Sequence, residues 1–300
     1  MINIIGNKKI FLFISGILVV GAIICIILFG LKQGIDFSGG SFLKFYFKDD
    51  KPKIEQLENL FIETLNIKDL KITYDFQNNY YFVRMPNLTN DDYQKINNVL
   101  KQKFSSYEEL SFQSIGPSIG ASIKQRAYIA IILVLIGISL YIAFAFRKVY
   151  VPVSSWKYGF VTLITLFHDV VIPTGMLALL GKTQGIEIDS NFVVALLVVM
   201  GFSVHDTIVV FDRIRENILN LKNKLNFEEI VNYSVNQTLA RSINTSLTLV
   251  LVLIALYFWG PLTLKYFILT LLVGTIVGTY SSIFVASPLL VIWQKFSSKK

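Results

Sequence analysis

An acidic residue and a basic residue stand in neighbouring apolar runs of this sequence. His205 and Asp206 fall within the run 191–211, and Arg241 begins the run 241–259. A charged side chain inside a bilayer costs at least about 2.5–3.5 kcal/mol, so it marks a functional site that faces protein or water. Burial favours a neutral carboxyl group, whereas a nearby arginine favours the ionised form. The sequence therefore predicts that Asp206 binds and releases a proton beside Arg241, or that the two form a static pair that only fixes helix register.

Two further polar residues extend this set, each with a simpler explanation. Arginine does not lose its proton in proteins, so a protonation cycle would run on Asp206 while Arg241 changes partners. His205 points about 100° away from Asp206 around the helix and is either a proton relay or a packed, hydrogen-bonded residue. Asn244 follows Arg241 and either bonds the carboxylate or water, or is an interfacial polar residue.

A second buried polar pair lies in the run 158–180. His168 and Asp169 either line the same hydrated path or have a structural role, and Pro173, one turn later, loosens the backbone. Asp212 and Arg213 follow the fourth apolar run, where charges cost little. A solvated role that helps to set orientation is the simpler interpretation of these two.

The sequence offers little material for other chemistry. Cys25 is the only cysteine, and there are two histidines in the chain. This composition excludes an internal disulfide and a zinc cluster. It contains neither a hydrolytic triad nor a nucleotide-binding motif, so we expect no enzyme activity, no cofactor and no metal.

Composition places the chain in a membrane. Of its 300 residues 53% are hydrophobic, and the mean hydropathy is +0.57. The net charge of +8 would allow nucleic-acid binding, but the basic residues flank apolar runs. Membrane topology explains that placement better than a nucleic-acid partner does.

Six apolar runs are long enough to cross a bilayer of about 30 Å. We expect the first to be retained, because its end lacks the small residues of a signal-peptide cleavage site. The fold predicted is a polytopic helical membrane protein with three parts, namely residues 1–29, an outer domain at 30–124, and residues 125–300. The predicted spans are 10–29, 127–146, 158–180, 191–211, 241–259 and 264–293.

Basic residues in the short flanks give the orientation. One side has only Lys182 and Lys265 in its short loops, and the basic side of a membrane protein is normally cytoplasmic. The sequence thus predicts that both termini are cytoplasmic and that residues 30–124 are periplasmic or extracytoplasmic. The opposite, basic side includes Lys8, Lys9, Arg147, Lys148, Arg213 and Arg215.

The polar segment 30–124 has the pattern of one small α+β domain. Alternating residues predict strands, helical spacing predicts two helices, and Asn90 is the expected N-cap of the second helix. The order is β-α-β-β-α-β, which is the ferredoxin-like arrangement. The predicted strands are 41–48, 70–76, 80–85 and 109–115, the helices are 54–65 and 90–104, and a turn is expected at Gln77-Asn78-Asn79.

Two features of the remaining sequence concern packing. Residues 212–240 are polar with interspersed apolar residues, which predicts a cytoplasmic helical hairpin lying along the membrane surface. Gly274 and Gly278 form a G-x-x-x-G pair in the sixth span. Such a pair either lets a neighbouring helix approach closely or occurs by chance in a span that tolerates glycine.

Four stretches resemble a known family. They are similar to the G-x-D-F-x-G-G motif after the first span, the His-Asp motif of the third span, and the fourth- and fifth-span signatures of the SecD/SecF family in the RND superfamily. One small outer domain fits the SecF branch better than the SecD branch. The stretches are Gly34-Ile-Asp36-Phe-Ser-Gly39-Gly40, Leu166-Phe-His168-Asp169-Val170, Gly201 to Asn217 with Asp212 and Arg213, and Asn236 to Leu247.

The resemblance implies a function in protein export. Members of this branch pair with SecD and assist the SecYEG channel, in some cases with YajC, by drawing unfolded polypeptides outward with the proton-motive force. It further implies a location in the bacterial cytoplasmic (inner) membrane, and it makes Asp206 the proton-carrying residue and Arg241 the fifth-span arginine. His205 departs from the asparagine that is common at its position. The alternatives are an RND-like proton-coupled transporter of small molecules and a passive scaffold for other membrane subunits.

Overall fold

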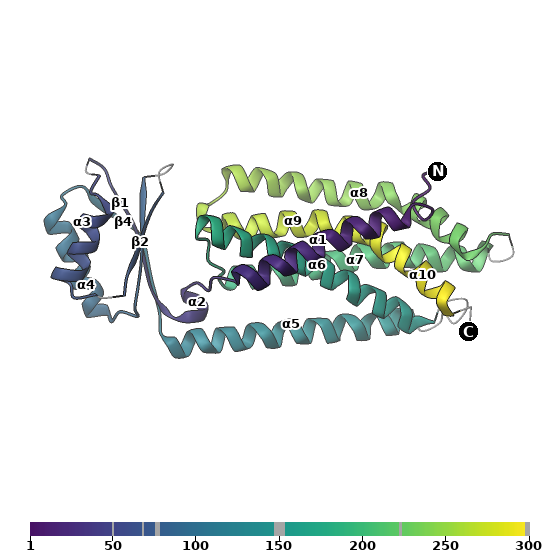
Figure 1. Cartoon of the computed structure of the whole chain (residues 1–300), viewed down its shortest axis with the longest axis horizontal. Coiled ribbons are helices and arrows are strands. Elements are labelled where there is room, and N and C mark those ends of the chain that lie inside the picture. Colours follow the sequence, from purple (N-terminus) through teal and green to yellow (C-terminus); the bar gives the residue numbers. More distant parts are fainter. Residues whose placement is uncertain (50, 68, 76–78, 147–153, 222–223, 298–300) are drawn as a thin grey trace. The chain divides into compact units, whose positions relative to one another are not determined.

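The computed structural model describes the chain except for residues 50, 68, 76–78, 147–153, 222–223 and 298–300 (Figure 1). The chain forms two compact units, one at 33–128 and the other made of 1–32 with 129–300. Gln77 and Asn78 of the predicted turn, and Arg147 and Lys148 of the basic flank, lie outside the described residues.

The unit 33–128 contains a four-stranded sheet in the order β2-β3-β1-β4, with every neighbouring pair antiparallel. This order confirms the predicted ferredoxin-like fold. A π-helical turn, Leu60–Thr64, continues α3. The elements are α2 (Ile35–Ser38), β1 (Gly40–Phe47), α3 (Ile54–Asn59), β2 (Lys71–Asp75), β3 (Tyr80–Met85), α4 (Asn90–Lys103) and β4 (Tyr107–Ile115).

Alternation along the strands builds the core of this unit. Leu43, Phe45 and Phe47 of β1 are buried, while the residues between them are half-buried. They pack with Leu57 of α3 and Leu100 of α4 in one apolar cluster. Side chains of a strand alternate between faces, so one face of the sheet meets the helices.

The N-cap of α4 differs from the prediction. Thr89, not Asn90, caps the helix, and its hydroxyl accepts from the main-chain nitrogen of Asp92 at 3.3 Å. The same hydroxyl donates to the Asp92 carboxylate at 2.7 Å. Thr89 therefore fits the N-cap role better than Asn90, since its hydroxyl bonds both the main-chain nitrogen and the carboxylate of Asp92, the third residue of the helix.

Six helical segments among the described residues are long and apolar enough to cross a membrane, which confirms the predicted fold class. The sixth is divided by a π-helical turn at Ser282–Ala286, preceded by a short 3-10 turn at Leu262–Leu264. The segments are α1 (Lys8–Phe29), α5 (Pro117–Ala145), α6 (Ser155–Gln184), α7 (Ser190–Leu221), α8 (Phe227–Trp259), and α9 (Lys265–Ser281) with α10 (Ser287–Ser297).

The predicted surface hairpin at 212–240 is built from the ends of two spans. Helix α7 continues to Leu221, and α8 begins at Phe227, capped by Asn226. The apolar residues Ile214, Ile218 and Ile230 are buried in the same cluster as the spans. The apolar face of this hairpin is therefore covered by the protein, and its place along the membrane surface stays a prediction.

Glycines allow two pairs of helices to approach closely. A methyl group at Gly274 of α9 would overlap Val199 of α7, and one at Gly278 would lie 3.1 Å from Cβ of Ser203. The G-x-x-x-G pair is thus a packing contact between α9 and α7. At Gly175 of α6 a methyl group would lie 2.5 Å from Cα of Ala22 on α1.

Main-chain groups of the N-terminal residues are bound by two side chains of α8. Asn232 Oδ1 accepts from the nitrogens of Ile4 and Ile5 at 3.0 and 3.1 Å. Asn236 accepts from Ile2 N at 2.8 Å and donates to Ile2 O at 2.9 Å. We call Asn232 and Asn236 the N-terminal clamp. It attaches the start of the chain to α8.

Replacement of Gly175 by alanine tests the contact between α1 and α6. The added methyl meets backbone atoms of Ala22, which cannot rotate away, so overpacking should destabilise the protein by about 1–3 kcal/mol. Thermal unfolding of the purified protein in detergent measures the change. The control is Gly137→Ala on α5, where no atom lies within 4 Å. Equal melting temperatures for the two variants would contradict the contact.

Candidate functional site

Two carboxylates are buried inside the helical unit. Asp169 lies in α6 and is 0% exposed, and Asp206 lies in α7 and is 6% exposed. Helices α6, α7 and α9 pack against one another. Pro173 has no N–H and cannot donate to the carbonyl of Asp169 four residues earlier. The helix is therefore locally weakened at one of the two acids.

Asp169 is held by hydroxyl groups from two other helices. Ser281 Oγ of α9 donates to Asp169 Oδ2 at 2.7 Å, and Ser203 Oγ of α7 donates to the same oxygen. His168 Nδ1 lies 2.8 Å from Asp169 Oδ1. One carboxylate thus links three spans, as expected for a buried polar group that must be hydrogen-bonded.

Asp206 has a hydroxyl partner of the same kind. Ser282 Oγ donates to Asp206 Oδ2 at 2.6 Å. Ser281 and Ser282 are consecutive, and successive residues of a helix point about 100° apart. This divergence lets two adjacent serines reach acids on two different helices, at the point where α9 passes into its π-helical turn.

His168 connects this site to the first span. Its ring lies 6.4 Å from the ring of Tyr280 in a stacked arrangement, and the Tyr280 hydroxyl donates to the carbonyl of Phe11 at 2.9 Å. His168 Nε2 is buried and has no hydrogen-bond partner among the described residues. An orphaned buried nitrogen beside an acid is the kind of group found where protons are exchanged.

The pairing of Asp206 with Arg241 predicted from the sequence is not formed. Arg241 is exposed, and none of the ion pairs found among the described residues includes it. The buried stripe of α8 passes through Thr238, Ser242 and Ser246. Arg241 immediately precedes Ser242 and so points about 100° away from that stripe. The rotation of α8 about its axis accounts for the difference.

Two other predicted residues lie away from the buried acids. His205 is exposed on α7, and Asn244 is exposed on α8. The structure therefore brings Asp169, His168 and Asp206 together with buried serines. His205 of α7 and Asn244 and Arg241 of α8 are exposed instead.

The glycine motif has a conformational role. Gly39 and Gly40 have φ angles of 73° and 122°, which other residues rarely adopt. A methyl group at Gly39 would also lie 2.9 Å from Cα of Pro117. Gly34 precedes α2, and Asp36 lies in its first turn, where an acid is favourable. The motif turns the chain from α2 into β1.

Arg213 joins the two helices of the hairpin. It donates to Gln237 Oε1 of α8 at 2.6 Å and pairs with Glu216 of its own helix at 2.5 Å. Asp212 pairs with Arg215 at 3.6 Å within α7, and an exposed pair of this kind contributes little to stability. Arg213 therefore has a structural role, and Asp212 has the solvated character expected from the sequence.

Sequence reasoning missed the serines. Ser203, Ser281 and Ser282 are all buried. Serine occurs often within membrane spans, so its presence alone does not indicate a functional site. Ser203 precedes Asp206 by three residues and shares its helix face, which is the one signal that was present. The partners of Ser281 and Ser282 depend on helix packing that no local pattern encodes.

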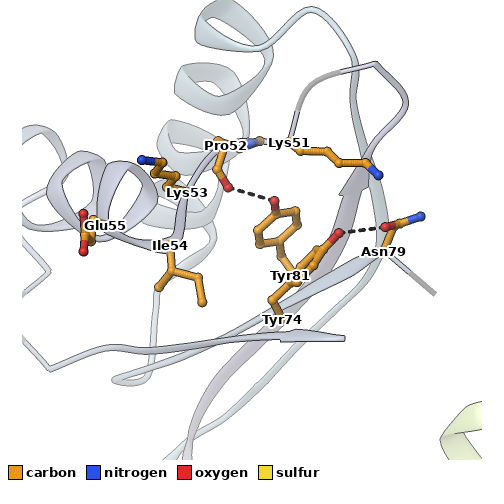
Figure 2. Close-up of a pocket in the computed structure, with 8 residues that line it drawn as sticks. All are labelled: Lys51, Pro52, Lys53, Ile54, Glu55, Tyr74, Asn79 and Tyr81. Atoms are coloured by element: carbon orange, nitrogen blue, oxygen red, sulfur yellow. Dashed lines mark hydrogen bonds between the residues drawn. The ribbon is translucent and has the colours of Figure 1, made fainter. Parts of the chain in front are cut away.

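The unit 33–128 has a separate open pocket of about 530 Å³, lined by residues 51–55, by Tyr74 of β2, and by Asn79 and Tyr81 around the start of β3 (Figure 2). Within it the Tyr81 hydroxyl donates to Pro52 O at 2.8 Å, and the Tyr74 hydroxyl donates to Asn79 at 2.7 Å. Burial, then the nearby Tyr74, raises the pKa of Tyr81 above its ordinary value. Lys51 and Lys53 line the pocket together with Glu55, so its wall carries charges of both signs.

Comparison with known proteins decides the family. A family model described as protein export membrane protein SecD/SecF, C-terminal, matches residues 95–296. The chain belongs to the SecD/SecF family. Protein translocase subunit SecF from Thermobaculum terrenum is 45% identical, covering 98% of this chain and 94% of that protein. The same subunit from Anaerolinea thermophila is 39% identical with the same coverage.

A solved structure extends the comparison. The crystal structure of SecDF from Thermus, described as a translocon-associated membrane protein, matches with a TM-score of 0.84 and 33% identity. The match covers 98% of this chain and 39% of the SecDF chain, so this chain spans well under half of that protein. Membership of the SecD/SecF family, together with six apolar spans, makes this chain a multi-pass membrane protein.

A double-mutant cycle tests the arrangement around Asp206. Because Asp206 and Arg241 are not paired, the variants Asp206→Asn and Arg241→Gln should change stability additively, within about 0.5 kcal/mol. Unfolding of the isolated chain in detergent measures this coupling. The matched cycle of Asp206→Asn with Ser282→Ala should give a coupling free energy of at least about 0.5 kcal/mol, since those two side chains are hydrogen-bonded. A larger coupling with Arg241 than with Ser282 would contradict the structure.

Proposed function

We propose that this chain is a SecF-type subunit of the accessory complex of the Sec protein translocase, and that it uses the proton-motive force to promote polypeptide export across the bacterial cytoplasmic membrane. The relatives named protein translocase subunit SecF support the first part of this proposal. The second part is supported by one observation in particular, which is the burial of Asp206 beside a hydroxyl group.

The surroundings of Asp206 suit a group that changes its charge. Within the described residues no lysine or arginine pairs with it. An ionised carboxylate without a buried cation is costly in the interior of a protein, whereas a neutral acid is satisfied by a hydroxyl. Proton binding and release would therefore change how α7 packs against the sixth span.

The exposed polar residues of α8 support a membrane partner. Arg241, Asn244 and Thr245 are exposed within an apolar helix, and lipid tails cannot satisfy an arginine or an amide. SecD is the partner we propose for this surface, in keeping with the SecDF relative. We extend the proposal to the SecYEG channel, with or without YajC, and to an unfolded polypeptide as the cargo.

The orientation that we propose follows from the basic flanks. Both termini would be cytoplasmic, and the unit 33–128 would be periplasmic, where it can meet the emerging polypeptide. Repacking of the spans around Asp206 would then be transmitted to that unit through the ends of α1 and α5, to which it is joined. The chain acts in this account as a transducer without bond-making chemistry.

Replacement of Asp206 by asparagine should abolish the stimulation of export by a proton gradient, because asparagine cannot bind and release a proton. Translocation of a secreted protein into membrane vesicles, with and without the gradient, measures the effect. We expect export to fall to the level of vesicles that lack this subunit. The control Glu216→Gln removes an acid from the same helix at a position where the side chain is 54% exposed. Undiminished stimulation in Asp206→Asn would refute the proposal.

A further inference from the structure

Ser281 and Ser282 each have two acceptors within reach. Ser281 Oγ lies 2.7 Å from Asp169 Oδ2 and 3.0 Å from the carbonyl of Gly278. Ser282 Oγ lies 2.6 Å from Asp206 Oδ2 and 2.9 Å from the carbonyl of Thr279. A hydroxyl carries a single proton, so each serine donates to one of its two acceptors at a time.

This geometry fits both charge states of the acids. When a carboxylate is ionised, its serine donates to it. When the carboxyl group takes up a proton, its own O–H donates to the serine oxygen, and the serine proton rotates to the backbone carbonyl three residues earlier. The only proton gained is the one bound by the acid, and in both states the carboxyl group and its serine remain hydrogen-bonded to each other.

We propose that Asp169 is a second proton-binding carboxylate, and that Ser281 and Ser282 couple its protonation to that of Asp206. The proposal deepens the proposed function and rests on it, since that function requires only Asp206. Two links carry the coupling. The serines are adjacent in one turn, and Ser203, which bonds Asp169, lies three residues before Asp206 on α7.

His168 provides a route for the proton to Asp169. Its Nδ1 faces Asp169 Oδ1, and its Nε2 is buried without a partner among the described residues. A proton accepted at Nε2 allows Nδ1 to give its own proton to Oδ1, which leaves a neutral imidazole protonated at Nε2. The site has then gained one proton, and Asp169 carries it.

The other titratable groups near the acids do not neutralise them. On α9 the Tyr280 ring stacks on His168. On α1, which packs against α6, the titratable residues are Lys8 and Lys9 at its first turn and Cys25. His205 of α7 and Arg241 of α8 are exposed. In the part of the chain that the structure describes, the polar contacts of both acids come from serines and His168.

Infrared difference spectroscopy of the full chain in liposomes tests the proposal. A carboxylic acid gains a C=O stretching band when it is protonated, and the bands of the two buried acids are identified among the 20 acidic residues by comparison with variants. Asp206→Asn should remove one and Asp169→Asn the other. Each single variant should also shift the titration midpoint of the remaining band by about one pH unit or more, which is the mark of interacting sites.

Serine variants separate coupling from structure. Ser281→Ala keeps both acids and should shift both midpoints, because it removes the hydroxyl that adapts to the charge of Asp169. The control is Ser287→Ala, since Ser287 is equally buried but donates to the carbonyl of Ser282 at 3.4 Å. It should leave both midpoints unchanged.

The outcomes that overturn the proposal are distinct from those that overturn the proposed function. A wild-type spectrum in Asp169→Asn would show that Asp169 binds no proton, and identical midpoints in Ser281→Ala and Ser287→Ala would remove the serine coupling. If Asp169→Asn does not fold, the comparison of Ser281→Ala with Ser287→Ala alone tests the proposal. The proposed function is judged separately by export in Asp206→Asn.

Discussion

Inside a bundle of lipid-crossing helices, the oxygen atoms of a buried carboxylate are shielded from solvent, and neighbouring spans must supply their hydrogen bonds. Asp169 meets this requirement with hydroxyls of α7 and α9 and with a histidine of its own helix. Serine side chains are short, so the helices that carry them must be close together. The absence of side chains at Gly274 and Gly278 allows α9 to approach α7. The polar network and the glycine packing therefore depend on each other.

Much of the architecture follows from periodicity in the sequence. Apolar runs of about 20 residues gave the spans, because a helix of that length matches the bilayer. Period-two alternation in β1 gave a strand with Leu43, Phe45 and Phe47 on one face. These features were predictable since each is encoded by residues that are close in sequence.

Partners across helices were less predictable. Whether Arg241 meets Asp206 depends on the rotation of α8 about its axis, and a shift of one position moves a side chain by about 100°. Ser281 and Ser282 gave no signal, because a serine in a span more often bonds its own backbone. The environment of the hairpin at 212–240 was hard to predict for a related reason. Its amphipathic pattern is the same whether the apolar face meets lipid or protein, and Ile214 and Ile218 meet protein.

The N-terminal clamp has a consequence for how this sequence can diverge. Asn232 and Asn236 bind the nitrogen and oxygen atoms of the main chain at Ile2, Ile4 and Ile5. Peptide groups are the same in every residue except proline, which lacks the N–H, and Ile2 is 60% exposed. Any residue but proline at position 2 can therefore keep these bonds, whereas replacement of either asparagine by an apolar residue would remove them.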